Sequence, residues 1–292
     1  MRLVHLGNVV IDLVLTVDAL PERGGDVLAG STLRATGGGF NVMAAASRLG
    51  LATSYGGVLG TGPFGDQARD DLRREGIDFP QPQNPELDTG FVVAIVEAGG
   101  ERTFVTSPGA EATLTGLPET TDEDYVYVSG YSLMYELNRA TLVRHLADLR
   151  GTVFFDPGPL VGQIPRDALA AALARADWLS CNTQEAAALE DLRRSALEDL
   201  PTPTHVLVRR GPDGCTLDNQ PVEGFQVEAV DLNGAGDTHS GAFLAALAAG
   251  HDPLEAARRA NAAAALAVTH RGPATGPTQA ELEAFLRSPA DA

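Results

Sequence analysis

A glycine-rich stretch in the last third of the chain, Asp231-Leu-Asn-Gly-Ala-Gly-Asp237, combines an anion-binding backbone with a carboxylate. We expect residues 226–230 before it to form a strand and residues 238–249 after it to form a helix, so that the glycines fall at a helix N-terminus. Glycines let the main chain approach an anion closely, and free N–H groups and the helix dipole favour negative charge there. The stretch therefore predicts a phosphate site.

Asp237 is an unusual residue for such a site, because a carboxylate repels phosphate unless it has a separate role. One role is to accept the proton of an attacking hydroxyl, and the other is to cap the helix N-terminus, where Asp is common. The preceding Gly-Ala-Gly favours the first role, since an ordinary cap does not need that backbone freedom. Both remain open at this point.

A second glycine run, Gly37-Gly38-Gly39-Phe40-Asn41, also precedes an expected helix, at 40–49. Three glycines permit a ligand to lie close to the main chain, and the Asn41 amide can donate to and accept from a sugar hydroxyl. The alternative is a tight strand-to-helix turn without a ligand.

A third segment, Asn182-Thr-Gln-Glu185, begins a helix after the strand-like residues 178–181. Asn182 and Glu185 lie on one helix face, where they could order water bound to magnesium, a metal that prefers oxygen ligands and keeps several waters. They could equally cap the helix. His239, two residues after Asp237, we expect to pack in the interior.

Other nucleotide sites are disfavoured. The motif Gly60-Thr-Gly62-Pro-Phe-Gly65 matches G-x-G-x-x-G, but it follows a strand and a helix instead of opening the first unit, and Pro63 occupies its centre. The chain contains no Lys, which excludes a Walker A loop, a Schiff-base enzyme and a protein-kinase fold.

The charge of the chain bears on its partners. Its 21 basic and 39 acidic residues give a formal charge of −18, which disfavours duplex nucleic acid as a partner.

The elements that must position these residues alternate between strand and helix over most of the chain. This predicts an α/β fold with a mostly parallel sheet covered by helices on both faces. Residues 13–36 and 89–106 contain strands and turns without helices, and Gly99-Gly100 indicates a hairpin. We expect a small separate β-sheet that acts as a lid, and the alternative is an ordinary hairpin at a sheet edge. We expect one domain over residues 1–292.

The compartment is predicted from two features. No run of about 18 apolar residues occurs, so we expect no membrane span. Cys181 and Cys215 form no CxxC motif and are expected to be reduced thiols. A cytoplasmic protein is the simplest interpretation.

Taken together, the segments at 37–41, 182–185 and 231–237 resemble, in kind and order, the ribokinase-like (pfkB) family of carbohydrate kinases, and within it an uncharacterised sugar-kinase subgroup. The resemblance covers nearly the whole chain. It implies a Rossmann-like domain with a β-sheet lid that often forms a dimer interface, and it implies ATP and Mg²⁺, with K⁺ in some members. The activity that it implies is transfer of the γ-phosphoryl of ATP to a hydroxyl, expected to be primary, of a sugar.

The resemblance also implies roles for individual residues. Asp237 matches the general base, and the amides of Gly234, Ala235 and Gly236 match the anion hole. The implied substrate residues are Asp12, Gly38 and Asn41; the nucleotide residues are Asn182, Gly211 and Asn261; and the metal residues are Glu185, for Mg²⁺ through water, and Asp231, for a monovalent cation.

Departures from the family pattern leave the substrate open. Leu232 and His239 replace the usual Thr and aromatic residue, and residues 156–159 lack the Asn and Arg often seen after Asp-Pro. A nucleoside or sugar-phosphate kinase of the same superfamily, and a sugar-sensing homologue without catalysis, are the alternatives.

Overall fold

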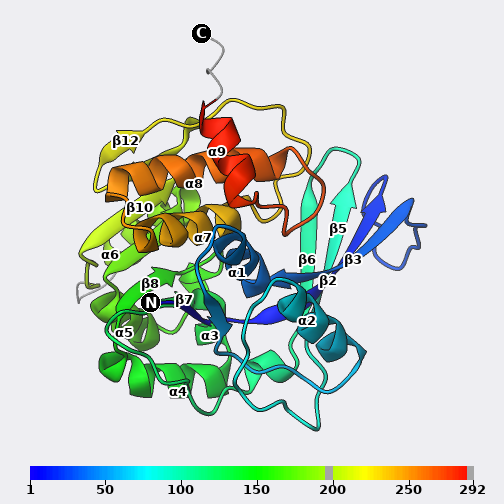
Figure 1. Cartoon of the computed structure of the whole chain (residues 1–292). Coiled ribbons are helices and arrows are strands. Elements are labelled where there is room, and N and C mark those ends of the chain that lie inside the picture. The colour runs from blue at the N-terminus through cyan, green and yellow to red at the C-terminus, as the bar shows by residue number, and fades with distance from the viewer. Residues whose placement is uncertain (195–199, 288–292) are drawn as a thin grey trace.

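The computed structural model describes residues 1–194 and 200–287 and folds them around two β-sheets (Figure 1). Within these residues, the larger sheet has eight strands in the order β12-β11-β10-β9-β8-β7-β1-β4, and the smaller sheet has four in the order β3-β2-β5-β6. The pairings from β4 to β10 are parallel, whereas β11 and β12 add antiparallel strands at one edge. The predicted mostly parallel sheet is confirmed.

The strands of the larger sheet are Leu3–Leu6 (β1), Thr53–Tyr55 (β4), Tyr125–Ser129 (β7), Thr152–Asp156 (β8), Trp178–Asn182 (β9), His205–Arg209 (β10), Cys215–Leu217 (β11) and Gln220–Val222 (β12). Those of the small sheet are Val9–Val17 (β2), Ser31–Gly38 (β3), Phe91–Glu97 (β5) and Arg102–Ser107 (β6). The α-helices are Gly39–Arg48 (α1), Pro63–Arg74 (α2), Gly130–Met134 (α3), Glu136–His145 (α4), Arg166–Arg175 (α5), Thr183–Arg194 (α6), Ala235–Ala248 (α7), Pro253–Val268 (α8) and Gln279–Arg287 (α9).

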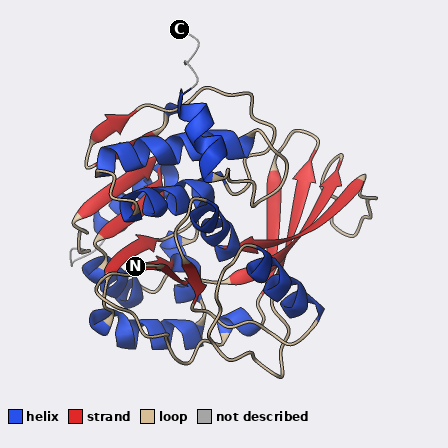
Figure 2. Cartoon of the chain, in the orientation of Figure 1, coloured by secondary structure: helices blue, strands red, loops and turns tan. Residues whose placement is uncertain are grey.

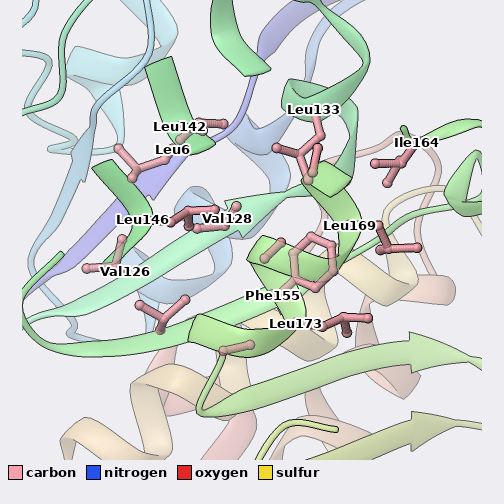
Figure 3. Packing of buried hydrophobic residues seen from close by; sticks show 14 of the residues in the cluster. Leu6, Val126, Val128, Leu133, Leu142, Leu146, Phe155, Ile164, Leu169 and Leu173 are labelled. Atoms are coloured by element: carbon pink, nitrogen blue, oxygen red, sulfur yellow. The ribbon is translucent and has the colours of Figure 1, made fainter. Parts of the chain in front are cut away.

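Helices cover both faces of the larger sheet, and the small sheet stands to one side of it (Figure 2). Because side chains alternate between the faces of a strand, neighbouring residues of β8 enter different cores. Phe155 packs with Leu169 of α5 and other apolar residues of the α3–α6 side (Figure 3). Phe154 packs on the opposite face with Phe243 of α7 and Ala260 of α8. Both aromatic side chains are fully buried.

Close packing of α1 against α7 brings two expected site segments together. A Cβ at Gly241 of α7 would lie 2.3 Å from the carbonyl oxygen of Val42 in α1, so only glycine permits this approach. The N-terminus of α1 thereby lies beside the N-terminus of α7. Asn41 and Asp237, 196 positions apart in the sequence, come into contact.

The two segments expected to form a separate sheet do so. Strands β2 and β3 pair antiparallel, as do β5 and β6, and β2 joins the hairpins by pairing parallel with β5. Gly100, in the turn between β5 and β6, has φ +85°, which glycine tolerates best. Among the described residues, no helix is long and apolar enough to cross a bilayer.

One predicted strand is wrong. Residues 226–230 form no strand, although the sequence there alternates like one. β12 pairs with β11 at this edge of the sheet, and the chain beyond it turns to α8, where the amides of Val230 and Asp231 donate to the carbonyl of Val268 at 2.7 and 3.1 Å. The glycine-rich loop is thus held by the end of a helix, not by a sheet.

Candidate active site

The carboxyl ends of adjacent parallel strands gather the polar residues of the site. β8 ends at Asp156, β9 at Asn182 and β10 at Arg209, and these strands are neighbours in the sheet. Asn182 and Arg209 are direct register partners. In open α/β sheets ligands bind outside the carboxyl ends of the strands, so this edge is the expected position of a site.

Asp237 lies at this edge, partly exposed, as the third residue of α7. The N-cap of α7 is Gly234, and no described side chain caps this helix end, so the capping role considered for Asp237 is excluded. Its Oδ2 instead accepts a hydrogen bond of 2.9 Å from Asn41 Nδ2. Burial raises the pKa of Asp237 to about 6, with Asp156 adding to the rise and the hydrogen bond from Asn41 and the charge of Arg209 opposing it.

The carboxyl group of Asp12 experiences the charge of Asp237. Burial, and then the charge of Asp237, raise the pKa of Asp12 to about 7. Asp12 lies on β2 against Gly37 of β3, where a Cβ would come within 2.2 Å of its Oδ2. Glycine at position 37 is therefore needed to leave room for this carboxylate. Asn41 completes the group, and its Oδ1 is buried without a hydrogen-bond partner among the described residues.

The loop before α7 presents free amides beside Asp237. Gly234 has φ +74°, and a Cβ there would lie 1.8 Å from the carbonyl oxygen of Pro273. Ala235 N makes only a long turn hydrogen bond, 3.4 Å, to Leu232 O, and the described residues provide no acceptor for the amide of Gly236. Unpaired N–H groups at a helix N-terminus are ready to bind an anion.

Arg209 places a partly buried cation under this loop. Its guanidinium donates to Asp156 Oδ2 at 3.0 Å and to the hydroxyl of Ser180, and it lies 3.5 Å from Glu185 Oε2. Its Nε is 3.5 Å from where a Cβ of Gly236 would be. The guanidinium thus offsets carboxylate charge where phosphate would bind. Arg209 and Asp156 are not among the residues predicted from the sequence, although each ends a strand, a position that could have indicated them.

The comparisons with known proteins bear directly on this arrangement. Residues 1–280 match the model of the family described as pfkB family carbohydrate kinase. The chain belongs to the pfkB family. It is 33% identical to an uncharacterised sugar kinase, YegV, of Escherichia coli, over 95% of this chain and 91% of the relative. It is 33% identical to an ATP-dependent ribose-1-phosphate kinase of Halopiger xanaduensis, over 98% of each chain.

A solved structure agrees with this assignment. The ribokinase of Thermotoga maritima superposes with a TM-score of 0.79 at 26% identity, covering 99% of this chain and all of the other. A nucleoside kinase of Methanocaldococcus jannaschii, at 18% identity over 98% of each chain, shares the fold with a TM-score of 0.81. The predicted family, fold and class of activity, an ATP-dependent carbohydrate kinase, are confirmed.

In this pfkB kinase the segment 182–185 caps its own helix. Asn182 N donates to Glu185 Oε2 at 2.7 Å, and Glu185 N donates to Asn182 Oδ1 at 2.8 Å, a reciprocal capping box. Burial and the nearby Asp156 raise the pKa of Glu185, against the opposing effects of the Asn182 amide and Arg209. The capping arrangement and a role near phosphates are compatible, because Glu185 Oε1 has no partner among the described residues.

Gly211 and Asn261, the two other residues expected to contact the nucleotide, differ in how closely other residues surround them. Gly211 has φ +60°, and nothing lies within 4 Å of where its Cβ would be. Asn261 is enclosed: its Nδ2 donates to the carbonyls of Val222 and Glu223 at 3.1 and 3.0 Å, and its Oδ1 lies 3.0 Å from His239 Nε2. His239 is buried, and burial lowers its pKa to about 3, so it packs as a neutral side chain, as expected.

A glycine-rich loop at 60–65 and a surface hollow both lie outside the site. At 60–65 the amides of Phe64 and Gly65 donate to the carboxylate of Asp88 at 3.0 and 2.7 Å, so the kinase itself fills the anion position there. A surface hollow of about 650 Å³ is lined by residues such as Arg150, Asp177 and His205, at the opposite end of the parallel strands from Asp237.

Gly38 holds the second glycine run in place. It has φ +63°, and a Cβ there would lie 2.7 Å from the carbonyl oxygen of Asn8. Gly39 N donates to that same carbonyl at 2.7 Å. The run is a tight strand-to-helix turn, as one alternative held, and it also sets Asn41 beside Asp237.

Proposed function

We propose that this kinase moves the γ-phosphoryl group of ATP to a hydroxyl, expected to be primary, of a sugar, with Asp237 as the general base. The observation that carries the proposal is the carboxylate of Asp237, held by Asn41 beside unpaired amides at the N-terminus of α7. A base and an anion hole next to each other are what phosphoryl transfer to an alcohol requires.

Each residue of the site has its own role in the proposed reaction. Asp237 accepts the proton of the sugar hydroxyl as its oxygen attacks, and the amides of Gly234, Ala235 and Gly236 stabilise charge on the transferring group. Asp12 and the unpaired Oδ1 of Asn41 accept hydrogen bonds from other sugar hydroxyls. The small sheet excludes water from the site, so that water does not take the phosphoryl group.

ATP and Mg²⁺ fit the residues at the strand ends. A relative in Halopiger xanaduensis is described as ATP-dependent, and a structure from Escherichia coli with the same fold, at 24% identity, contains ATP and Mg²⁺. The open main chain at Gly211 and the Asn182 position would face the nucleotide, with Asn261 supporting the adjoining carbonyls. When bound, Mg²⁺ neutralises phosphate charge, and Glu185 Oε1 would hold one of its waters.

The negative charge of the acceptor position favours a neutral substrate. Asp12 and Asp237 put two carboxyl groups at the acceptor position, which suits the neutral hydroxyls of a sugar and repels a second phosphate. The similarity to a ribose-1-phosphate kinase keeps a sugar phosphate as the second candidate. A sensor without catalysis would have no need to keep both the base and the free amides.

A substrate panel tests the proposal. Free sugars, sugar phosphates and nucleosides are each incubated with the kinase, ATP and Mg²⁺, and release of ADP is measured against ATP alone. We expect at least one neutral sugar to stimulate release by at least about 100-fold, because base catalysis alone is worth roughly 10²–10⁴-fold. Stimulation by sugar phosphates only would favour the second candidate, and no stimulation by any compound would contradict the proposed reaction.

A homodimer through the small sheet is part of the proposal. Leu33, Val14, Ala94 and Phe104 are successive register partners and form one apolar row across this sheet. Leu33 and Phe104, at its ends, are 45% and 56% exposed. A second copy of the chain would cover such a row.

We also propose that the enzyme lies in the cytoplasm, where its two buried free thiols, Cys181 and Cys215, would stay reduced.

Replacing Phe104 by Glu tests the dimer. A charge within an apolar contact between two sheets is costly to bury, so the variant should sediment as a monomer while the wild type sediments as a dimer. Analytical ultracentrifugation measures both, and Val143→Glu, on an exposed position of α4, is the control that should stay dimeric. A monomeric wild type at micromolar concentration would contradict the proposed interface.

A further inference from the structure

Arg102 of the small sheet contacts the loop that leads to the anion-binding amides. Its guanidinium forms an ion pair with the carboxylate of Asp231, which lies 129 positions away in the sequence. Asp231 is the residue that the family resemblance associates with a monovalent cation. Its surroundings therefore show whether such a cation fits this chain.

The oxygens of Asp231 are already taken by donors. Oδ1 accepts from Arg102 and, at 2.9 Å, from the amide of Asn233, and Oδ2 accepts from the amide of Gly272 at 3.1 Å. Burial raises the pKa of Asp231, but these amides and Arg102 outweigh burial and lower it. A metal cation needs acceptors that point toward it, and here a fixed cation and two N–H groups occupy the carboxylate. A monovalent metal ion does not fit this arrangement.

We infer that Arg102 is the built-in cation of this loop, so that the kinase works without a monovalent metal ion. The inference rests on the proposed function of the loop as an anion hole. Asp231 carries a negative charge three residues before Gly234, where it opposes binding of phosphate unless a cation neutralises it. Arg102 supplies that charge from its own chain.

The same contact positions the loop. The bond from Asn233 N to Asp231 Oδ1 fixes the turn directly before Gly234, and the segment after α8 closes it from the other side, with Gly272 bonded to Asp231 and Pro273 against Gly234. Arg102 begins β6, opposite Val96 at the end of the β5–β6 hairpin. Figure 1 shows this hairpin beside the loop that follows α8. Arg102 is thus a positioning residue that joins the small sheet to the anion-binding loop.

The experiment compares cations in the wild type and in two matched variants. Arg102→Gln removes the proposed internal cation, and Arg34→Gln removes an exposed guanidinium from the same small sheet. For each protein, kcat with the best sugar of the panel and the Kd for ATP with Mg²⁺, by calorimetry, are measured in potassium chloride and in tetramethylammonium chloride at equal ionic strength. Thermal unfolding establishes that each variant is folded.

We expect the wild type and Arg34→Gln to differ by less than about twofold between the two salts. In tetramethylammonium, Arg102→Gln should lose about tenfold in kcat, and in potassium it should regain most of that loss. The loss is smaller than the ~10²–10³-fold cost of removing an oxyanion-hole donor, because the amides themselves remain. A wild type that needs potassium would overturn the inference and leave the kinase function standing. So would an Arg102→Gln variant that is unaffected, or one that potassium does not restore.

The wild-type comparison decides the question even if Arg102→Gln fails to fold. If no compound of the panel is phosphorylated, the proposed function fails, and the Kd for ATP in the two salts still tests the inference: equal values support it, and tighter binding in potassium contradicts it.

Discussion

Asp237→Asn is expected to keep the fold and the binding of ATP while kcat falls by at least about 100-fold, the lower part of the range for loss of a general base. The amide has nearly the same shape as the carboxylate and can still contact Asn41, so the neighbouring groups should stay in place. It cannot accept the proton of the sugar hydroxyl. Because its surroundings raise the pKa of Asp237, the ionised carboxylate costs stability, and its removal should leave stability unchanged or higher.

The measurement is steady-state ADP release with the best sugar of the panel, together with calorimetric binding of ATP. The control is Asp252→Asn, the same isosteric change at the N-cap of α8, where the side chain accepts from the amides of Leu254 and Glu255. Asn caps helices as well as Asp does, so this variant should be fully active. Wild-type turnover in Asp237→Asn would remove Asp237 from the base role.

Gly234→Ala is expected to have the second-largest effect, a loss of about 100-fold in kcat, similar to removal of one oxyanion-hole donor. The added Cβ would lie 1.8 Å from the carbonyl oxygen of Pro273, a distance that no rotamer can relieve. The loop must therefore shift, and the amides of Ala235 and Gly236 move with it. Binding of free ATP should weaken less than turnover falls, since the hole acts mainly on the charge that develops during transfer.

Gly250→Ala is the matched control, because Gly250 follows the other end of the same helix. Gly250 has φ +87°, so alanine there carries the same cost of a left-handed backbone, about 1–2 kcal/mol, but nothing lies within 4 Å of its Cβ. Thermal unfolding should show the backbone cost alone in Gly250→Ala and a larger loss of stability in Gly234→Ala, and only Gly234→Ala should lose turnover. Equal kcat values in the two variants would show that the 234–236 amides do not contact the transferring group.

The sequence predicted the parts of the site that lie within one segment. Glycines at 37–39 and at 234 and 236 mark close approaches of the main chain, and in each segment the structure shows a contact that a Cβ would block. The role of Asp237 could be narrowed but not decided, since capping and base roles use the same residue type at nearly the same position. The N-cap at Gly234 excludes the capping role, and the contact with Asn41 supports the base role, which stays a proposal.

The sequence could not predict the parts that depend on the order of the strands. Asp156, Ser180 and Arg209 meet only because β8, β9 and β10 are neighbours in the sheet. The contact between Arg102 and Asp231 depends on how the small sheet stands against the loop before α7. The strand predicted at 226–230 failed for a related reason, because the alternation of side chains does not reveal that β12 already occupies the sheet edge.

The pH dependence of kcat/KM tests the central claim most directly, because it reports the ionisation of the free enzyme's essential groups. The pKa values of Asp237 and Asp12 are both raised, to about 6 and about 7, so both carboxylates are ionised above these values and become protonated below them. The account therefore predicts a plateau at higher pH and a fall through pH 7 to 6. A kcat/KM that stays level down to about pH 4, the range of ordinary carboxyl groups, would contradict it.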